Sequence, residues 1–444
     1  MSYGASDLAA GEQPVWRNWA REQICAPQQI ASPTSEQQLV GLVAAAAERG
    51  LQVRAVGSGH SFTNCACTDG LMVDMSGMQR ILEVDHDRGQ VTVEAGVKLH
   101  ALGPQLARLG LSLENQGDID VQSLSGAIST ATHGTGVGFQ NMSARVTGLR
   151  LVTADGLVHE LGADGDRDQY LAARVSVGAL GVISALTIQC VPLYTLHRHD
   201  QPLPLAETLD RLDQLVDEND HFEFWVFPYT QVALTRRLRR SSEEPVPPPR
   251  WRRTVQEDVL ENTVLDLLCH MGRAVPRLAP LINRLFTAAM SEARIEDRAY
   301  RVYATKRAVR FTEMEYAIPR EHARSAVERV LAFVQRRRLP IVFPIEVRFT
   351  AGDEAFLSTA HGRTTCHVAV HQFHGMEFET YFRAVESIMD EYDGRPHWGK
   401  RHYQAAATLA TRYPEWDRFQ AVRRRLDPQG TFANDYTRRV FESD

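Results

Sequence analysis

The chain has 444 residues, a length that allows two or three domains of ordinary size. Hydrophobic residues make up 43% of it and charged residues 23%, which is typical of a globular protein in water. The formal net charge of −6 gives no reason to expect a nucleic acid or an anionic membrane as a partner. A small polar molecule is the ligand that these numbers favour.

The six cysteines are scattered and do not form the pattern of a disulfide-stabilised scaffold. We therefore expect free thiols in a reducing compartment, and the lack of an apolar signal core near the N-terminus favours the cytoplasm. No stretch reaches the ~18 uninterrupted apolar residues that a transmembrane helix needs. The nearest candidate, residues 259–290, is interrupted by Asp, Arg and Pro. We interpret it as amphipathic helices packing on a core, with contact to a membrane surface as the alternative.

The first 190 residues alternate between short strands and helices. Thr34 and Ser35 can cap a helix that stops at Gly50, and a second helix is expected over residues 98–109, with Gly110 as its C-cap. Alternating apolar residues predict strands, two of which form a hairpin that turns at the Asp-Gly pair before residue 157. The predicted strands are residues 53–56, 71–74, 81–85, 91–94, 146–153, 157–161 and 182–191.

The pattern loosens near residue 196, and we place a domain boundary there, which gives domains at residues 12–195 and 196–444. The basic, proline-rich stretch of residues 236–253 is interpreted as a solvated surface loop, with a lid or a partner-docking segment as the alternative. The elements predicted beyond it are strands at 302–309, 341–350 and 366–372 and helices at 320–338 and 414–426.

Two segments of the first domain suit a large ligand. In the first, the predicted strand at residues 53–56 enters the loop Gly57-Ser58-Gly59-His60. Its glycines allow the backbone to approach a ligand, and consecutive amides in such a loop bind pyrophosphate. A plain tight turn is the alternative, and the GxGxxG sequence of a Rossmann site is absent. The second segment, residues 114–136, is dense in Gly, Ser and Thr and suits a backbone wrapped around a flat ligand.

These two segments resemble the FAD-binding domain of the vanillyl-alcohol oxidase superfamily, and within it the aldonolactone and alditol oxidases, the group that includes L-gulonolactone oxidase. The resemblance spans roughly residues 15–190 and resumes near the C-terminus, at residues 427–436. It implies an α+β fold. An FAD-binding domain of the vanillyl-alcohol oxidase type would precede a mixed α/β substrate (cap) domain, whose last residues can pack back on the FAD domain.

The resemblance implies that the loop over residues 55–61 holds the FAD pyrophosphate and that His60 is bonded to the flavin 8α-methyl group. No cysteine lies between Cys67 and Cys190, so a second covalent link is not expected. Gly117 would lie at the reactive edge of the flavin, where a small residue leaves room for O2 and favours an oxidase over a strict dehydrogenase. The implied FAD-binding residues are Ala55, Val56, Gly57, Ser58, Gly59, His60, Ser61, Gly117, Asp118, Ser123, Gly126, Thr130, Thr132, His133, Gly134, Gly178, Val182 and Ile183.

Glu346 and Arg348 lie two residues apart in a predicted strand, so their side chains emerge on the same face. The pattern alone fits an ordinary ion pair, in which Arg348 would hold Glu346 ionised. The aldonolactone and alditol oxidases carry Glu-x-Arg at this place, and the resemblance therefore implies that the pair is catalytic.

The His-Trp-x-Lys signature of the same group matches residues 397–400, with glycine in place of the usual alanine. It implies that Lys400 is catalytic, close to the flavin and to the substrate oxygens, where a cation stabilises developing negative charge. Asp118, His371 and His397 are implied substrate contacts. Phe373 stands where a relative has threonine, which leaves the substrate's shape open.

Four histidines, at positions 361, 367, 371 and 374, include spacings that suit a metal site on a helix. The residues around them indicate a strand, on which these side chains would not converge on one ion. We therefore expect no metal site.

The expected reaction is oxidation of a CH–OH group of an aldonolactone such as L-gulono-1,4-lactone. Hydride would pass to flavin N5, and O2 would reoxidise the flavin and give hydrogen peroxide. The alternatives are an alditol oxidase that acts on xylitol or sorbitol, an aldonolactone dehydrogenase with another electron acceptor, and a flavin-binding protein without turnover.

Overall fold

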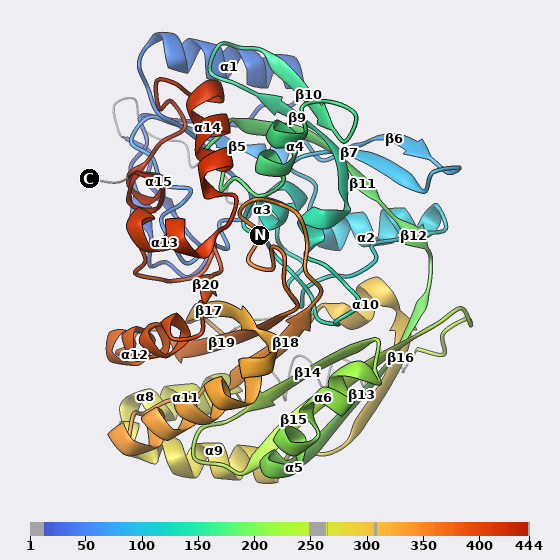
Figure 1. Ribbon diagram of the computed structural model, residues 1–444, viewed down its shortest axis with the longest axis vertical. Helices are drawn as coiled ribbons and strands as arrows, with labels where there is room; N and C mark the ends of the chain where they lie inside the picture. The colour runs from blue at the N-terminus through green and yellow to red at the C-terminus, as the bar shows by residue number, and fades with distance from the viewer. Residues whose placement is uncertain (1–12, 248–262, 264, 306–308, 443–444) are drawn as a thin grey trace.

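Figure 1 shows a computed structural model of the chain, which describes residues 13–247, 263, 265–305 and 309–442. Helices and strands are mixed along the whole of this described part, which confirms the predicted α+β class. Two smaller sheets lie in the upper half of Figure 1, and one large sheet lies in the lower half.

A parallel three-stranded sheet carries the glycine loop. In it, β3 (Gln29–Ala31) and β4 (Val53–Val56) both pair with β5 (Leu71–Asp74). Helix α1 (Glu36–Glu48) joins β3 to β4, and the side chain of Ser35 caps it by accepting a hydrogen bond from the Gln38 amide. The helix that was predicted to follow Ser35 and the strand predicted at residues 53–56 are confirmed. The glycine loop follows directly after β4.

An antiparallel five-stranded sheet packs beside it in the same core. The strand order is β10-β9-β11-β7-β6, and the hairpin of the first two strands turns at Gly156, whose φ is +76°. The strands are β6 (Ile81–Asp85), β7 (Gln90–Glu94), β9 (Val146–Val152), β10 (Val158–Gly162) and β11 (Val182–Gln189).

Short elements complete this half of the molecule. The helices are α2 (Leu99–Arg108), α3 (Leu124–Ser129) and α4 (Arg167–Arg174), with single 3-10 turns at Met75–Gly77 and Met142–Arg145. Two two-stranded ladders pair β1 (Trp16–Arg17) with β2 (Ile24–Cys25), and β8 (Leu111–Ser112) with β12 (Val191–Pro192).

The large sheet has eight antiparallel strands in the order β16-β13-β15-β14-β18-β19-β17-β20. It begins at Thr195, next to the place where the sequence pattern loosens. The strands are β13 (Thr195–Pro204), β14 (His221–Val226), β15 (Val232–Ser241), β16 (Ala293–Arg298), β17 (Phe311–Pro319), β18 (Ile345–Thr350), β19 (Thr365–Phe373) and β20 (Arg395–Pro396).

The two faces of this sheet have opposite chemistry. Alternate residues such as Met314, Val347 and Val368 pack with helices in one apolar core. The intervening residues, among them Glu315 and Glu346, point to the other face and are charged or polar although they are buried. The helices of this half are α5 (Leu205–Asp210), α6 (Leu212–Asp217), α8 (Leu265–Ala274), α9 (Ala279–Ala288), α10 (Ala299–Tyr303), α11 (Ala323–Arg337) and α12 (Glu379–Asp390), with 3-10 turns at Pro276–Leu278 and Arg320–His322.

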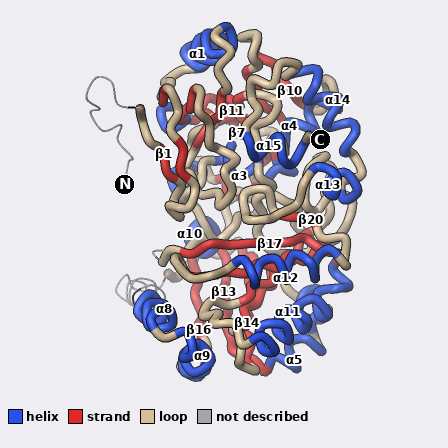
Figure 2. Tube along the Cα trace, turned by 90° about the vertical axis from the view of Figure 1, so that its left-hand side faces the viewer, coloured by secondary structure: helices blue, strands red, loops and turns tan. Residues whose placement is uncertain are grey.

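The C-terminal segment returns to the first half of the molecule. Helices α13 (Ala406–Arg412), α14 (Trp416–Leu426) and α15 (Asp435–Phe441) lie in the same half as α1 and β11, which both Figure 1 and Figure 2 show. Their apolar side chains join one core with those of α1, β5 and β7. The Val53 amide, at the start of β4, donates to the Thr431 carbonyl at 2.8 Å.

Two element predictions are wrong. Residues 299–303 form α10 where a strand was predicted from residue 302, and residues 306–308 lie outside the described part. The stretch from residue 236 was predicted as a solvated loop, but residues 236–241 belong to β15, and Arg236 is only 7% exposed because Asp200 and Glu223 pair with it. Residues 242–247 of that stretch form a mostly exposed loop, as predicted, and residues 248–253 lie outside the described residues.

The segment interpreted as amphipathic helices contains α8 and α9. Cys269 and Ile282 are buried, but Leu267, Leu281 and Leu285 are more than half exposed, so only one face of each helix packs on a core. Within the described residues, no helix has the length and apolar character needed to cross a membrane.

Candidate active site

The glycine loop after β4 is packed tightly against the start of α3. A side-chain carbon on Gly57 would lie 2.0 Å from Oγ of Ser123, the N-cap residue of α3, so only glycine fits there. Gly59 has a φ of +63°, a conformation that favours glycine, and a side-chain carbon there would meet Trp16. The loop backbone is therefore left open to a ligand along a groove.

This groove brings together most of the residues predicted to bind FAD. Lys98, which the sequence prediction missed, donates from Nζ to Oγ of Ser58 at 3.0 Å and places a cation behind the loop. The predicted residues that line the groove are Ala55, Val56, Gly57, Ser58, Gly59, His60, Ser61, Ser123, Gly126, Thr130, Gly178 and Ile183.

A second cavity, of about 660 Å³, lies between the FAD-binding half and the charged face of the large sheet. His60, Ser61 and Thr130 line both this cavity and the groove, so the two spaces meet at the end of the loop. The predicted residues that line this cavity are His60, Ser61, Gly117, Asp118, Thr130, Thr132, His133, Glu346, Arg348, His371, His397 and Lys400.

Two predicted residues line neither space. Val182 is 2% exposed and packs in the core beneath the groove. Gly134 borders a smaller neighbouring cavity, where a side-chain carbon would lie 2.5 Å from Oδ1 of Asn115 and from the Gln116 carbonyl oxygen. Gly134 therefore allows close packing of the two loops.

His60 stacks on Trp19, with ring centroids 4.5 Å apart and an angle of 19° between the planes. Burial lowers the pKa of His60 below its usual value. A neutral imidazole retains a nucleophilic ring nitrogen at neutral pH, and its ring orientation is fixed by the stack. These are the properties that a histidine needs to form a bond to a ligand in the groove.

Glu346 and Arg348 emerge from β18 on the cavity face, as their spacing predicts, and their charged groups are 2.5 Å apart. Arg348 is shared, however, because Glu223 lies 2.8 Å and Asp118 3.2 Å from it. Burial, together with the charges of Asp118 and Glu223, raises the pKa of Glu346 although Arg348 opposes the shift. Arg348 favours the ionised form of Glu346, as expected, but the other contributions outweigh it, and the raised pKa makes Glu346 a better proton acceptor.

Lys400 reaches the cavity between two carboxylates of β17 that the sequence prediction missed. Its Nζ lies 2.5 Å from Oε1 of Glu313 and 2.7 Å from Oε2 of Glu315. His371 Nε2 lies 3.2 Å from the same oxygen of Glu313, while His371 Nδ1 faces the Pro344 carbonyl. The two-residue period of Glu313 and Glu315 was the available signal, but alternating acids are also typical of an exposed strand.

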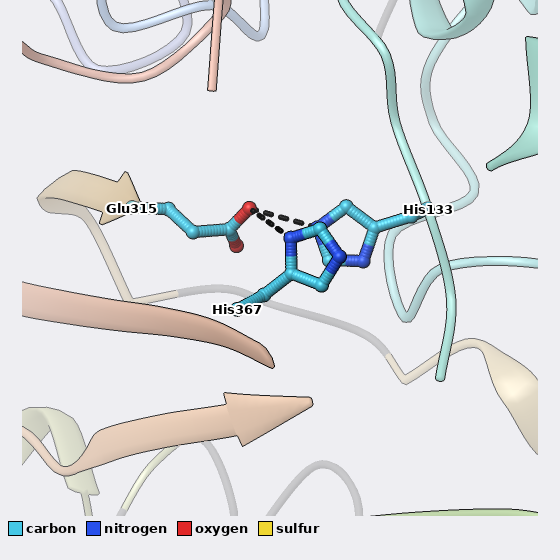
Figure 3. A group of neighbouring side chains, drawn as sticks. All are labelled: His133, Glu315 and His367. Atoms are coloured by element: carbon cyan, nitrogen blue, oxygen red, sulfur yellow. Dashed lines mark hydrogen bonds and ion pairs between the residues drawn. The ribbon is translucent and has the colours of Figure 1, made fainter. Parts of the chain in front are cut away.

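Glu315 also joins two stacked histidines, which Figure 3 shows. His133 Nε2 lies 2.8 Å from Oε1 of Glu315, and His367 Nδ1 lies 3.7 Å from it. The imidazole planes are nearly parallel, at 20°, with centroids 3.6 Å apart. Ligand lone pairs lie in the ring plane, so two parallel rings at this spacing do not aim at one ion. We interpret this group as a hydrogen-bonded link between the His133 loop and the large sheet.

A family model for D-arabinono-1,4-lactone oxidase matches residues 186–440, and one for an FAD-binding domain matches residues 27–162. L-gulono-1,4-lactone dehydrogenase of Mycobacterium tuberculosis is 65% identical over 427 residues, which are 96% of this chain and 99% of that protein. The chain belongs to the D-arabinono-1,4-lactone oxidase family. As a member of this family it is an FAD-dependent oxidoreductase of the vanillyl-alcohol oxidase superfamily.

More distant relatives of this D-arabinono-1,4-lactone oxidase family member are named for the same lactone and for alditols. L-gulonolactone oxidase of Mus musculus is 33% identical over 96% of this chain and 98% of that protein, and alditol oxidase of a Streptomyces species is 31% identical over the same shares. A solved structure of a cholesterol oxidase variant from Brevibacterium sterolicum superposes with a TM-score of 0.81 over 97% of both chains, at 19% identity. That likeness shows a shared fold.

The two family models match different parts of the site. The FAD-binding match includes the glycine loop and α3, and the D-arabinono-1,4-lactone oxidase match includes β17, β18, β19 and Lys400. Gly57, where a side chain would clash with Ser123, and Gly59, whose φ is positive, allow a tight loop whose backbone lines the groove and fits a bound FAD pyrophosphate. The cavity thus lies where the FAD-binding part and the family-specific part meet.

Proposed function

We propose that the chain oxidises a CH–OH group of a sugar lactone, L-gulono-1,4-lactone or a related aldonolactone. The observation that carries this proposal is the convergence of Glu346, Arg348 and Lys400 on one wall of the cavity into which the glycine loop opens. The relative at 65% identity is named for a lactone of this class.

FAD, when bound, supplies the acceptor for the hydride that leaves the carbon. Glu346 takes the proton of the hydroxyl group, since its raised pKa and its place on the cavity wall suit a general base. Arg348 fixes the carboxylate from 2.5 Å. Lys400 donates a hydrogen bond to a substrate oxygen and stabilises the negative charge that develops there. Asp118, His371 and His397 complete the polar part of the wall and orient the ring hydroxyls.

A substrate panel tests this proposal. The purified protein, loaded with FAD, is mixed under anaerobic conditions with L-gulono-1,4-lactone, with xylitol and with sorbitol, and loss of the flavin absorbance is recorded. Bleaching by the lactone supports the proposal. Bleaching only by the polyols would replace it with an alditol oxidase, and no bleaching by any of them would favour a flavin-binding protein without turnover.

We propose that His60 carries the flavin covalently. Its neutral, stacked imidazole at the junction of groove and cavity supports this role. The His60→Ala protein is expected to release all of its FAD on acid denaturation, whereas the wild type keeps its yellow colour in the precipitate. The measurement is flavin absorbance in the pellet and in the supernatant, and colour retained in the denatured variant would assign the bond to another residue.

We propose O2 as the electron acceptor, because Gly117 adds no side chain to the cavity wall. In Gly117→Ala, the new methyl carbon would lie 3.1 Å from the His133 carbonyl oxygen and occupy space at the flavin edge. Reoxidation by O2 is expected to slow by about tenfold, which corresponds to ~1.4 kcal/mol on the barrier, while reduction by lactone changes less. Stopped-flow measurement of the two half-reactions checks this. Equal slowing of both would contradict a role in O2 access, and a wild type that yields no peroxide would point to another acceptor.

We also propose that the chain works in a reducing compartment such as the cytoplasm. The support is that all six cysteines are free thiols. Several of them, including Cys65, Cys190 and Cys269, are buried. Thiols persist unpaired mainly where glutathione and thioredoxin keep them reduced.

A further inference from the structure

Lys400, like Arg348, is a proposed catalytic cation whose charge is balanced by more than one carboxylate. Glu313 and Glu315 are 3% and 2% exposed and occupy alternate positions of β17, so both point at the same face. Their nearer oxygens lie 2.5 and 2.7 Å from Nζ of Lys400. The segment of residues 397–400 is thereby fixed to β17, which lies next to the edge strand β20 of the large sheet.

The protonation states of this cluster follow from its contacts. Burial would raise the pKa of Glu313, but Lys400 and His371 outweigh it and lower the pKa to about 2. Burial is likewise outweighed at Glu315, whose pKa lies well below its usual value. Burial would lower the pKa of Lys400, yet the two carboxylates raise it above its usual value. All three groups are therefore ionised at neutral pH.

Each carboxylate has a second partner on another element. Oε1 of Glu313 also contacts His371 of β19, and Oε1 of Glu315 contacts His133 in the loop of the FAD-binding half. A side chain with only one anchor would leave the ammonium of Lys400 free to swing into the cavity. Because both carboxylates are held by a histidine, they fix Nζ of Lys400 in one position relative to both halves of the molecule.

We propose that Glu313 and Glu315 are positioning residues of the reaction, which fix Nζ of Lys400 at the cavity wall and set how much of its positive charge reaches the cavity. The proposal rests on the proposed function, in which Lys400 contacts the substrate. Lys400, Glu313 and Glu315 together carry one net negative charge. Because its charge is compensated, Lys400 acts mainly as a hydrogen-bond donor with a fixed position. This defines more narrowly the role that its sequence signature implies.

Replacing Glu313 by Gln changes the charge of the cluster from −1 to 0. The remaining carboxylate holds the Lys400 proton less firmly, so the pKa of Lys400 falls. The other titratable groups that face Lys400 are His60, His371 and His397. Burial lowers the pKa of His60 and brings that of His397 to about 3, so both are neutral in the alkaline range where Lys400 would titrate.

The test compares wild type, Glu313→Gln and the control Glu386→Gln, all loaded with FAD. Glu386 is a partly buried carboxylate on α12 that accepts a hydrogen bond from the Tyr316 hydroxyl on the opposite face of β17. We expect kcat/KM of Glu313→Gln to fall with rising pH in an alkaline range where wild type and control stay level. We also expect a flavin midpoint potential, measured by reductive titration without lactone, that is more positive than in wild type and control.

A pH profile and a potential of Glu313→Gln that match wild type would overturn the proposal. Glu313→Asp, which keeps the charge, is expected to restore both readouts, whereas a merely structural role predicts equal damage from Asp and Gln. If neither Glu313 variant folds, the same two measurements on Glu315→Gln decide. A wild type that the lactone does not reduce, combined with the expected shift in potential, would refute the proposed function and leave this inference standing.

Discussion

Replacing Glu346 by Gln is expected to slow flavin reduction by an aldonolactone by about 10²- to 10⁴-fold, the usual contribution of a general base. Gln keeps the size of the side chain but cannot accept the hydroxyl proton. Arg348 retains Glu223 at 2.8 Å and Asp118 at 3.2 Å, so no buried charge is left unpaired and FAD content should not change. Anaerobic stopped-flow absorbance measures the rate, and flavin absorbance of the purified protein measures the content.

The pH dependence offers a second check on Glu346. Wild-type kcat/KM is expected to fall as the pH decreases and Glu346 becomes protonated. Because the pKa of Glu346 is raised, this fall should occur at a higher pH than it would for an ordinary glutamate. The Glu346→Gln protein should lack this acidic limb because the titrating group is gone. The Glu386→Gln protein, in which a carboxylate remote from the cavity is removed, serves as the matched control. A Glu346→Gln rate close to wild type would exclude Glu346 as the base.

The Arg54→Met substitution is expected to lower the free energy of unfolding by about 3–5 kcal/mol, because it leaves several buried carbonyl oxygens without their donor. Arg54 is 3% exposed and donates to the carbonyl oxygens of Cys65, Val177, Gly178 and Phe432 at 2.6–2.9 Å. Methionine has no donor, and each acceptor left buried without one costs about 1–3 kcal/mol before relaxation. The melting temperature should fall, and the loop next to β4 should hold FAD less tightly.

Arg167→Met is the matched control for Arg54→Met. The Arg167 side chain is 61% exposed and pairs with Glu354, which is 63% exposed, and an exposed ion pair of this kind contributes about 0–1 kcal/mol. Calorimetric melting of both variants with and without FAD compares the two positions. Similar melting temperatures for both variants would show that Arg54 does not tie the segments together.

The glycine loop and the Glu346–Arg348 pair could be predicted because local patterns specify them. Gly57 and Gly59 mark a loop that a ligand approaches, and a two-residue period puts Glu346 and Arg348 on one face. The fold class followed from the resemblance of these local segments to the vanillyl-alcohol oxidase superfamily. Each of these features depends on residues within a few positions of one another, where sequence periodicity is most informative.

The partners of these residues could not be predicted, because they come from distant parts of the chain. Arg236 belongs to a basic run that is typical of a solvated loop, yet Asp200, 36 residues earlier, pairs with it inside the sheet. In sequence, Glu313 and Glu315 are typical of an exposed strand. In the structure they are paired with Lys400, which lies more than 80 residues later in the chain. Burial of a charged face is decided by what packs on it, which no local pattern records.

The return of α13, α14 and α15 to the first half determines when the cofactor site can be completed during synthesis. The core beneath the glycine loop includes Phe432 and Tyr436, and Arg54 donates to the Phe432 carbonyl. A ribosome-bound chain that ends before these residues exposes the apolar surface that they cover, and such surface is prone to aggregation. The core beneath the glycine loop is therefore complete only once residues 432–436 have been synthesised, although the loop itself lies near the start of the sequence.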